Sequence, residues 1–469
     1  MKKSIFLLFV FVALMAVLSV STVAAQSNRF RGEKSYIVIA QNEYNLPPAL
    51  LQQLRARGAE IEQLYANMGM VSVSSSNPAT LAGLPGVRSV VPNIQFHAIE
   101  PTRIQNLPGG FVASPPNTTD DDGYFNMQWG HDAVNVPEAW AQYGATGAGV
   151  RVAVLDSGID ATHPDLAPNV NTALSKSFVP GEDWQVQPGF YFNHGTHVAG
   201  IIAAADNGFG IIGVAPNAEI MAVKVLSEYT GSGDFDWVMN GIVYAANNGA
   251  DIINMSLGAT LPLFGDCDIY PPDECITARE VAELVIAMHR VTRYAYHRGV
   301  TIIASAGNDA IDFDHQNPIL IDLPAMLPYV VAVSATAPVG WAVDPTVNLD
   351  NLSSYSNYGN VIVDFAAPGG DYILPGDDVC EVDGVVNYCW VFDMVFSDIP
   401  GGYSWAAGTS MAAPYASGVA ALIIGGLGGS ASPWQVISIM RAASNDLGAP
   451  GKDPLFGYGR VNVDWSQRG

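Results

Sequence analysis

Three polar residues with complementary chemistry stand at widely separated points of the chain. Asp156 ends an apolar run, His194 opens a segment of small residues, and Ser410 lies two residues after Gly408. A serine hydroxyl is a poor nucleophile at neutral pH until an imidazole takes its proton, and the imidazole needs a carboxylate to fix its tautomer and stabilise its charged form. The three residue types therefore predict nucleophilic catalysis of acyl transfer.

Each of these residues also has an ordinary structural interpretation. An Asp after a strand is often a turn or cap residue, and a Ser at a helix start is often an N-cap. His194 and His197 have the His-x-x-His spacing of some zinc sites, but Gly195 stands where the helical zinc-protease motif has Glu. Zinc is therefore not expected here, and the catalytic interpretation rests on the three residues together.

The segments that carry the three residues closely resemble the signature motifs of the subtilisin-like serine proteases. They read LDSGID at 155–160, HGTHVAG at 194–200 and GTSMAAP at 408–414, in the Asp, His, Ser order of subtilisin. The resemblance covers roughly residues 127–465. It implies that Asp156 is the orienting acid, His194 the general base and Ser410 the nucleophile, and that His163 and His197 are structural.

The same resemblance implies residues that hold the substrate. Asn308 matches the family's side-chain donor to the oxyanion, although its glycine-rich surroundings alone indicate a turn. Asp309 beside it favours a basic or aromatic side chain before the cleaved bond. Two further segments match the backbone strands that grip an extended peptide by strand addition. They are Gly231, Ser232, Gly233 and Ser256, Leu257, Gly258.

Short apolar runs alternate with helical patterns through the part of the chain that contains these residues. Strands of this nearly continuous apolar kind are buried on both faces, so we expect an α/β fold with a doubly wound, mostly parallel sheet. Ligands of such folds lie beyond the carboxyl ends of the strands. The predicted strands are 150–155, 219–225, 252–255, 300–303 and 329–333, and the predicted helices are 194–205, 235–247, 278–298 and 410–422.

The N-terminal part has a different organisation. Residues 1–25 have the basic start, apolar run and small residues of a signal peptide, with an uncleaved anchor as the alternative. Residues 26–100 predict a small α+β, ferredoxin-like unit of βαββαβ order. Its order resembles the inhibitory propeptide of these proteases, and a permanent accessory domain is the alternative. Residues 101–126 predict a linker in which processing occurs, and 127–469 the peptidase domain.

Composition excludes several classes of protein. The chain has 20 Lys and Arg against 44 Asp and Glu, a net charge of −24, so a phosphate backbone would be repelled and no nucleic-acid partner is expected. Hydrophobic residues make up 49%, which excludes wholesale disorder. No apolar run of membrane-spanning length follows the signal segment. We therefore expect a secreted monomer that is not attached to a membrane after signal removal.

The four cysteines fall into two pairs that are close in sequence, Cys267 with Cys275 and Cys380 with Cys389. In an exported protein this spacing favours two local disulfides. Four cysteines nevertheless allow three connectivities, and zinc is the alternative ligand.

The resemblance further implies a structural calcium ion and no catalytic cofactor. Asp165 and the turn 205–211, which contains Asn207, match the family's tight calcium site, and Asp122 or its neighbour Asp121 supplies another carboxylate. Hard oxygen ligands of this kind suit Ca²⁺. The alternative is an Asn-Gly turn that binds no metal.

Together these observations predict a secreted serine endopeptidase that hydrolyses protein or peptide substrates through an acyl-enzyme. It would be made as an autoprocessed zymogen inhibited by its own propeptide. One alternative is an inactive binding protein of the same fold, which is disfavoured because no member of the catalytic set is missing. A second is the acid-active branch with a Glu base, which His194 disfavours.

Overall fold

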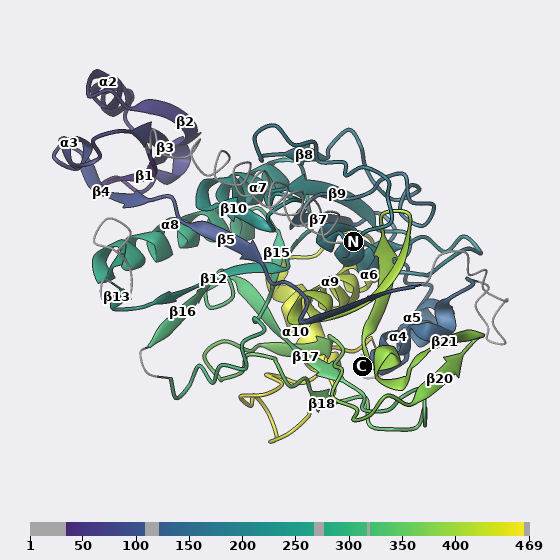
Figure 1. Ribbon diagram of the computed structural model, residues 1–469. Coiled ribbons are helices and arrows are strands. Elements are labelled where there is room, and N and C mark those ends of the chain that lie inside the picture. Colours follow the sequence, from purple (N-terminus) through teal and green to yellow (C-terminus); the bar gives the residue numbers. More distant parts are fainter. Residues whose placement is uncertain (1–33, 108–121, 267–275, 317–318, 464–469) are drawn as a thin grey trace, which may run out of the picture. The chain divides into compact units, whose positions relative to one another are not determined.

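The computed structural model describes residues 34–107, 122–266, 276–316 and 319–463 (Figure 1). The predicted signal peptide at 1–25 and the cysteine pair Cys267 and Cys275 lie outside these ranges. The chain divides into two compact units, Met1–Asn93 and Ile94–Gly469, and each is described by itself.

The first unit is a four-stranded antiparallel sheet with two helices, and its order matches the predicted βαββαβ pattern. The sheet order is β2-β3-β1-β4. Its core is apolar, with Leu54 and Val73 among the fully buried side chains. The elements are β1 (Lys34–Ala40), α2 (Pro48–Ala56), β2 (Glu60–Tyr65), β3 (Met70–Ser75), α3 (Ala79–Ala82) and β4 (Val87–Pro92).

The second unit is built on an eight-stranded sheet of order β18-β17-β15-β11-β7-β9-β8, with β19 paired to β17. All its strand pairs are parallel except β17 with β18. The prediction of a mostly parallel sheet is therefore confirmed. The strands are β7 (Arg151–Asp156), β8 (Lys176–Ser177), β9 (Glu219–Lys224), β11 (Ile252–Met255), β15 (Thr301–Ser305), β17 (Val330–Ala337), β18 (Asn351–Leu352) and β19 (Phe365–Pro368).

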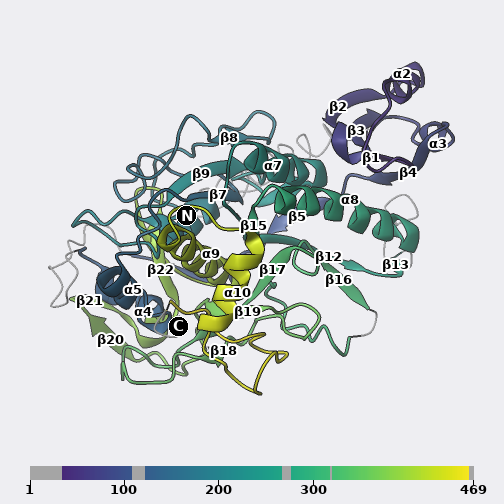
Figure 2. The ribbon, with the colours of Figure 1, turned by 180° about the vertical axis from the view of Figure 1, so that it is seen from behind.

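Two groups of helices cover this sheet, as a doubly wound fold requires. Helices α7 (Phe235–Asn247) and α8 (Ala278–His297) pack on each other and on the sheet, and so do α6 (His194–Ala203) and α9 (Thr409–Gly426). Figure 2 shows α10 (Pro433–Ala443) beside α9, which it contacts. Helix α9 is buried along almost its whole length, so it forms the centre of its layer. Two short helices, α4 (Trp129–Ala133) and α5 (Val136–Tyr143), precede β7.

The second unit also contains two smaller sheets, one with strands that follow β9 and β11 along the chain and one that packs on α6. One has the order β10-β5-β12-β16 and the other β22-β23-β6. Strands β5 and β6 come from residues just after the first unit, so the predicted linker at 101–126 contains a paired strand. The strands are β5 (Gln95–Ala98), β6 (Arg103–Asn106), β10 (Ser232–Asp234), β12 (Leu257–Pro262), β16 (Leu320–Leu323), β22 (Val395–Ile399) and β23 (Gly402–Ala407).

One predicted disulfide is present among the described residues. Cys380 and Cys389 are joined with a sulfur to sulfur distance of 1.99 Å, and they close the hairpin of β20 (Val379–Val382) and β21 (Val385–Tyr388). Within the described ranges, no helix combines the length and the apolar character needed to cross a membrane.

Candidate active site

The ends of adjacent parallel strands bring the predicted residues to one edge of the main sheet. Asp156 is the last residue of β7 and pairs in register with Lys224, the last residue of β9. Ser256 follows directly after β11, the other neighbour of β7. Because parallel strands end at the same edge, the chemistry of the unit concentrates there.

Asp156 and His194 form a buried pair. Nδ1 of His194 lies 2.9 Å from each carboxylate oxygen of Asp156. His194 is the first residue of α6, and Asn193 caps that helix because its Oδ1 accepts the Thr196 N–H at 2.9 Å. The cap fixes where the helix starts, and with it the position of the imidazole.

The environment of His194 sets the pKa of its ring. Burial by itself lowers that pKa, but the Asp156 charge and its hydrogen bond outweigh burial, and the pKa is raised above its usual value. Nε2 of His194 is buried and has no hydrogen-bond partner among the described residues. The ring nitrogen opposite Asp156 is therefore available to accept a proton.

Ser410 is the second residue of α9, where backbone N–H groups are not used by the helix. Pro414 lies inside α9 and has no N–H, so the Ser410 carbonyl loses its normal partner four residues on. The Ser256 hydroxyl donates to that carbonyl at 2.9 Å instead. A side chain after β11 thus fixes the start of α9 against the sheet edge.

Asn308 is oriented by the residue before Ser410. Its Oδ1 accepts the N–H of Thr409 at 2.9 Å and the Thr409 hydroxyl at 2.8 Å. Its Nδ2 is thereby turned outward and donates to the carbonyl oxygen of Glu100 at 2.9 Å. The amide can act as a hydrogen-bond donor to an oxygen that reaches the start of α9.

The two predicted substrate segments flank a strand of the chain itself. Residues Gln95–Ala98 form β5, which runs antiparallel between β10 and β12. The carbonyl of Gly231 accepts the Ala98 N–H at 2.8 Å, and the carbonyl of Ser256 accepts the Ile99 N–H at 3.0 Å. Ser232 and Gly233 pair with β5 from β10, and Leu257 and Gly258 pair with it from β12.

Beyond β5 the chain passes over the candidate nucleophile. The Ser410 hydroxyl donates to the carbonyl oxygen of Ile99, and the next carbonyl, that of Glu100, reaches Asn308. The Thr102 N–H then donates to Ala407 at 2.8 Å, and β6 continues along β23. An extended segment of the chain therefore lies between β10 and β12, a site called the groove below, with one carbonyl at the hydroxyl of Ser410.

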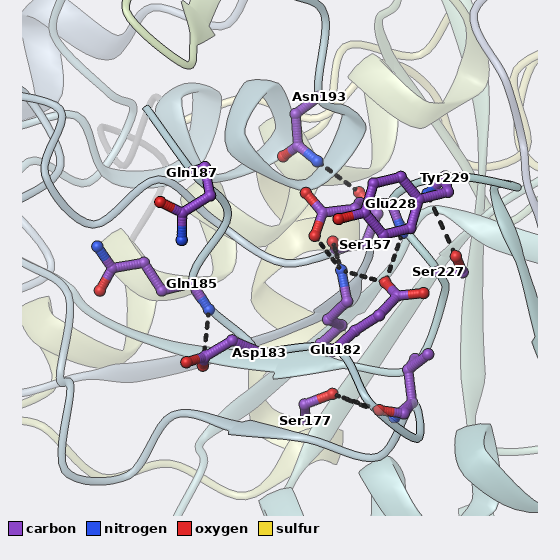
Figure 3. A network of polar contacts seen from close by, with 12 residues as sticks. Ser157, Ser177, Glu182, Asp183, Gln185, Gln187, Asn193, Ser227, Glu228 and Tyr229 are labelled. Carbon is purple, nitrogen blue, oxygen red and sulfur yellow. Dashed lines mark hydrogen bonds and ion pairs between the residues drawn. The ribbon is translucent and has the colours of Figure 1, made fainter. Parts of the chain in front are cut away.

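A buried lysine that the sequence reasoning missed lies beside the turn that follows Asp156. The Lys224 side chain is fully buried, and its ammonium donates to the Ser157 carbonyl at 2.6 Å. It also lies 3.0 Å from Glu182 and 3.7 Å from Glu228. Figure 3 shows Glu182 and Glu228 turned toward the same point beside Ser157. The ammonium attracts both carboxylates, and their charges offset the cost of burying the lysine.

Ser157 links Lys224 to the helix that carries His194. Its hydroxyl accepts the N–H of Gly195 at 3.1 Å. It also accepts the side-chain N–H of Asn193 at 3.1 Å (Figure 3). The sequence held one signal of this role, because Lys224 is a charged residue inside an otherwise apolar run. A buried lysine requires nearby acids, and only the folded chain shows which acids these are.

The predicted calcium ligands converge on one loop. The Asp122 carboxylate accepts the N–H of Phe209 at 3.1 Å, the Asp165 carboxylate accepts the N–H of Ile211 at 3.0 Å, and Asn207 donates to the Pro164 carbonyl at 3.4 Å. The second carboxylate oxygen of Asp165 is buried without a hydrogen-bond donor among the described residues. Hard oxygen donors with one buried carboxylate oxygen unpaired fit a Ca²⁺ ion.

Asp165 also belongs to a buried cluster with His163 and Asp398, a residue that the sequence reasoning missed. Ligand atoms of the three residues lie within 4.8 Å of one another. Burial lowers the pKa of His163 to about 4 and raises that of Asp165 to about 6. His163 is therefore neutral, as expected for a structural histidine. His197 is likewise buried, and it lies 3.0 Å from the Ser404 carbonyl.

Comparison with known proteins gives a consistent family. The model of the Subtilase family matches residues 147–459. Fervidolysin from Fervidobacterium pennivorans is 30% identical over 94% of this chain, which spans 57% of the length of that protein. Subtilisin NAT from Bacillus subtilis subsp. natto is 33% identical over 72% of this chain and 70% of its own length.

Solved structures agree with the sequence matches. The epidermin leader peptide processing serine protease from Staphylococcus aureus superposes with a TM-score of 0.70 at 22% identity, over 92% of this chain and 97% of that one. The fervidolysin structure, described as a keratinolytic enzyme related to subtilisin, gives a TM-score of 0.67 at 25% identity over 93% of this chain and 61% of its own.

Replacing the buried lysine tests the Lys224 network. In Lys224→Met, Glu182 and Glu228 keep their charges without a cation, so we expect the free energy of unfolding to fall by about 3–5 kcal/mol. Urea unfolding followed by circular dichroism measures this. The triple variant Lys224→Met, Glu182→Gln, Glu228→Gln removes the charges together and should recover most of the loss. Equal stability of Lys224→Met and the wild type would contradict the network's role.

Proposed function

The chain belongs to the subtilase family of serine endopeptidases, and on that premise we propose that it is a secreted endopeptidase made as an autoprocessed zymogen. Asp156, His194 and Ser410 are its acid, base and nucleophile. Asn308 is the side-chain donor to the oxyanion. Its partners are protein or peptide substrates, and before maturation also its own N-terminal segment.

One observation carries the proposal. A peptide carbonyl, that of Ile99, lies at the hydroxyl of Ser410 in a groove whose edges supply backbone hydrogen bonds, with the Asp156 and His194 pair at the same sheet edge. Strand addition of this kind holds a peptide without reading its sequence. The alternative of an inactive binding protein explains the groove but gives no reason for a buried His194 with a free Nε2.

The residues then act in two half-reactions. The Ser410 oxygen bonds to the carbonyl carbon while its proton moves to Nε2 of His194, and Asp156 stabilises the imidazolium. The amide of Asn308, which contacts the carbonyl of Glu100 in the uncleaved chain, moves to the neighbouring carbonyl oxygen that gains charge. The carbon to nitrogen bond breaks as His194 returns the proton to the leaving amine, and water releases the acyl group by the same steps. The Ser410 hydroxyl turns from the Ile99 oxygen to His194 to begin.

The position of Ile99 favours a maturation bond between Ile99 and Glu100, just before the processing region expected at 101–126. Its N–H bonds to Ser256 and its carbonyl contacts Ser410, as for the residue on the N-terminal side of a cleaved bond. Residues 26–99, which include the small α+β unit, are the propeptide, and β5 blocks the groove until it leaves.

The maturation bond is tested by the N-terminus of the exported protein. We expect the wild type to begin at Glu100 and Ser410→Ala to keep the residues before it, because the variant lacks the nucleophile. Intact-mass measurement of both proteins distinguishes them, with Ser417→Ala as a matched control that removes a hydroxyl elsewhere in α9. A Ser410→Ala protein that matures normally would contradict self-processing, and a wild-type start within 101–126 would contradict this bond.

The pH dependence of peptide hydrolysis tests the Asp156 and His194 pair. The base must be neutral, and the pKa of His194 is raised, so wild-type kcat/KM should rise with pH through a value above the usual 6.5. In Asp156→Asn the negative charge that raises the pKa of His194 is gone. The rise of kcat/KM should therefore move to lower pH, and kcat should fall by about 10⁴-fold. An unmoved rise in the variant would show that another group controls the ionisation.

We also propose that calcium is a structural cofactor held by Asp122, Asp165 and Asn207, with no part in the reaction. The ion would supply positive charge to two carboxylates and a side-chain amide that converge on the loop 205–211. His163 and Asp398 complete the buried surroundings of Asp165.

Thermal unfolding with and without calcium tests this cofactor. A cation that binds only the folded state adds about 2.7 kcal/mol at 100 times its Kd, so chelation should lower the melting temperature of the wild type. Asp165→Asn should lose most of this calcium-dependent difference, whereas Asp344→Asn, which removes an exposed carboxylate, should keep it. A wild-type melting temperature that is the same in calcium and in chelator would remove calcium from the account.

A further inference from the structure

A carboxylate lies in the pocket that receives the side chain of Ile99. A Cβ atom placed on Gly258 would lie 3.2 Å from Cδ1 of Ile99 and 3.3 Å from Oδ1 of Asp322. Gly258 belongs to β12, the strand between β5 and β16 (Figure 1). The absence of a side chain at Gly258 therefore opens a space that Ile99 and Asp322 share.

Asp322 is held in place on one side only. It pairs in register with Thr260 across β12 and β16, and the Thr260 hydroxyl donates to Oδ2 at 2.7 Å. Oδ1, the oxygen beside Gly258, accepts no hydrogen bond from the described residues. No Lys, Arg or His within the described ranges forms an ion pair with Asp322.

The surroundings make an uncompensated charge at Asp322 costly. The residue is only 2% exposed, and burial raises the pKa of its carboxyl to about 7, with the charge of Asp309 adding to the effect. A carboxylate in such a site is stabilised by a cation that enters with the substrate. The pocket is therefore incomplete when it holds an aliphatic side chain.

We propose that Asp322 selects substrates with lysine or arginine on the N-terminal side of the cleaved bond. The inference rests on the proposed endopeptidase function and names its substrate class. A lysine ammonium lies two bonds beyond the δ position at which Ile99 ends, so it extends from the Ile99 site toward Oδ1 of Asp322. Asp309, which is exposed, supplies a second negative charge that attracts the cation toward the pocket.

The Asp322 carboxylate distinguishes the chain's own segment at Ile99 from substrates with a basic side chain. Ile99 brings no cation, so β5 is held by its backbone bonds to Gly231 and Ser256 rather than by the pocket. A basic peptide gains the ion pair in addition to those bonds. Sites that pair a buried polar group with the substrate discriminate against substrates that lack the partner.

A peptide panel tests the assignment. The matured protein is given four chromogenic peptides that differ only in the residue before the cleaved bond, which is Lys, Arg, Leu or Glu. We expect kcat/KM for Lys and Arg to exceed that for Leu by about 10- to 100-fold, with Glu the poorest. The ratio of Lys to Leu cancels the shared dependence on His194 and Ser410.

Variants test whether the Asp322 carboxylate causes the preference for Lys and Arg. Asp322→Asn keeps the size of the side chain, and we expect it to lower the ratio of Lys to Leu to nearly one. Asp309→Asn should lower the ratio by less, because its carboxylate is exposed to solvent. Glu138→Gln, which removes an equal charge from the exposed surface of α5, is the control and should leave the ratio unchanged.

The outcomes separate the two levels of the proposal. A wild type that cleaves the Leu peptide as well as the Lys peptide overturns the Asp322 assignment, while cleavage that is lost in Ser410→Ala still supports the endopeptidase. A Lys preference that persists in Asp322→Asn also overturns it. If Asp322→Asn does not fold, the wild-type ratio and its change in Asp309→Asn decide the matter. A matured protein that cleaves none of the four peptides overturns the proposed function and this inference together.

Discussion

The buried contact between Asp156 and His194 is the interaction on which the rest of the site depends. A carboxylate at the end of a central strand and an imidazole at the start of a helix must meet within hydrogen-bond distance, away from water. Several neighbouring groups serve that contact. The Asn193 cap fixes the helix start, and Ser157 ties both the cap and Gly195 to the turn after Asp156. The Lys224 ammonium donates to the Ser157 carbonyl and lies close to the carboxylates of Glu182 and Glu228.

A second constraint is the backbone edge that β10 and β12 each present to the groove. Edge strands present unpaired backbone groups that invite another strand. Here residues of the same chain occupy them, so the groove is filled by a peptide with its carbonyl at Ser410. Under the proposed function, the same backbone edges would bind a substrate and be blocked by the chain's own segment before maturation. In the proposed role of Asp322, its carboxylate adds side-chain selection to backbone hydrogen bonds that do not select a sequence.

Much of the scaffold could be predicted from sequence, because burial on both faces leaves a strong local pattern. The predicted helix at 235–247 has the bounds of α7, and the apolar run at 252–255 has the bounds of β11. The residues around Asp156, His194 and Ser410 were found because short motifs accompany them. Partners that come together only through long-range folding were not predicted. Strand β6 has the composition of a linker and exists because β23 pairs with it. Asp322 and Lys224 gain their roles from strands distant in sequence, and Asp398 from a segment without a motif.

Reaction of the matured protein with a fluorophosphonate, followed by peptide mapping, tests most directly whether the three residues act together. The account predicts a single adduct on Ser410, with the rate of labelling reduced by orders of magnitude in His194→Ala although Ser410 is still present. Adducts on other serines at a comparable rate, or labelling of Ser410 at the wild-type rate without His194, would contradict the claim that Asp156 and His194 activate this hydroxyl.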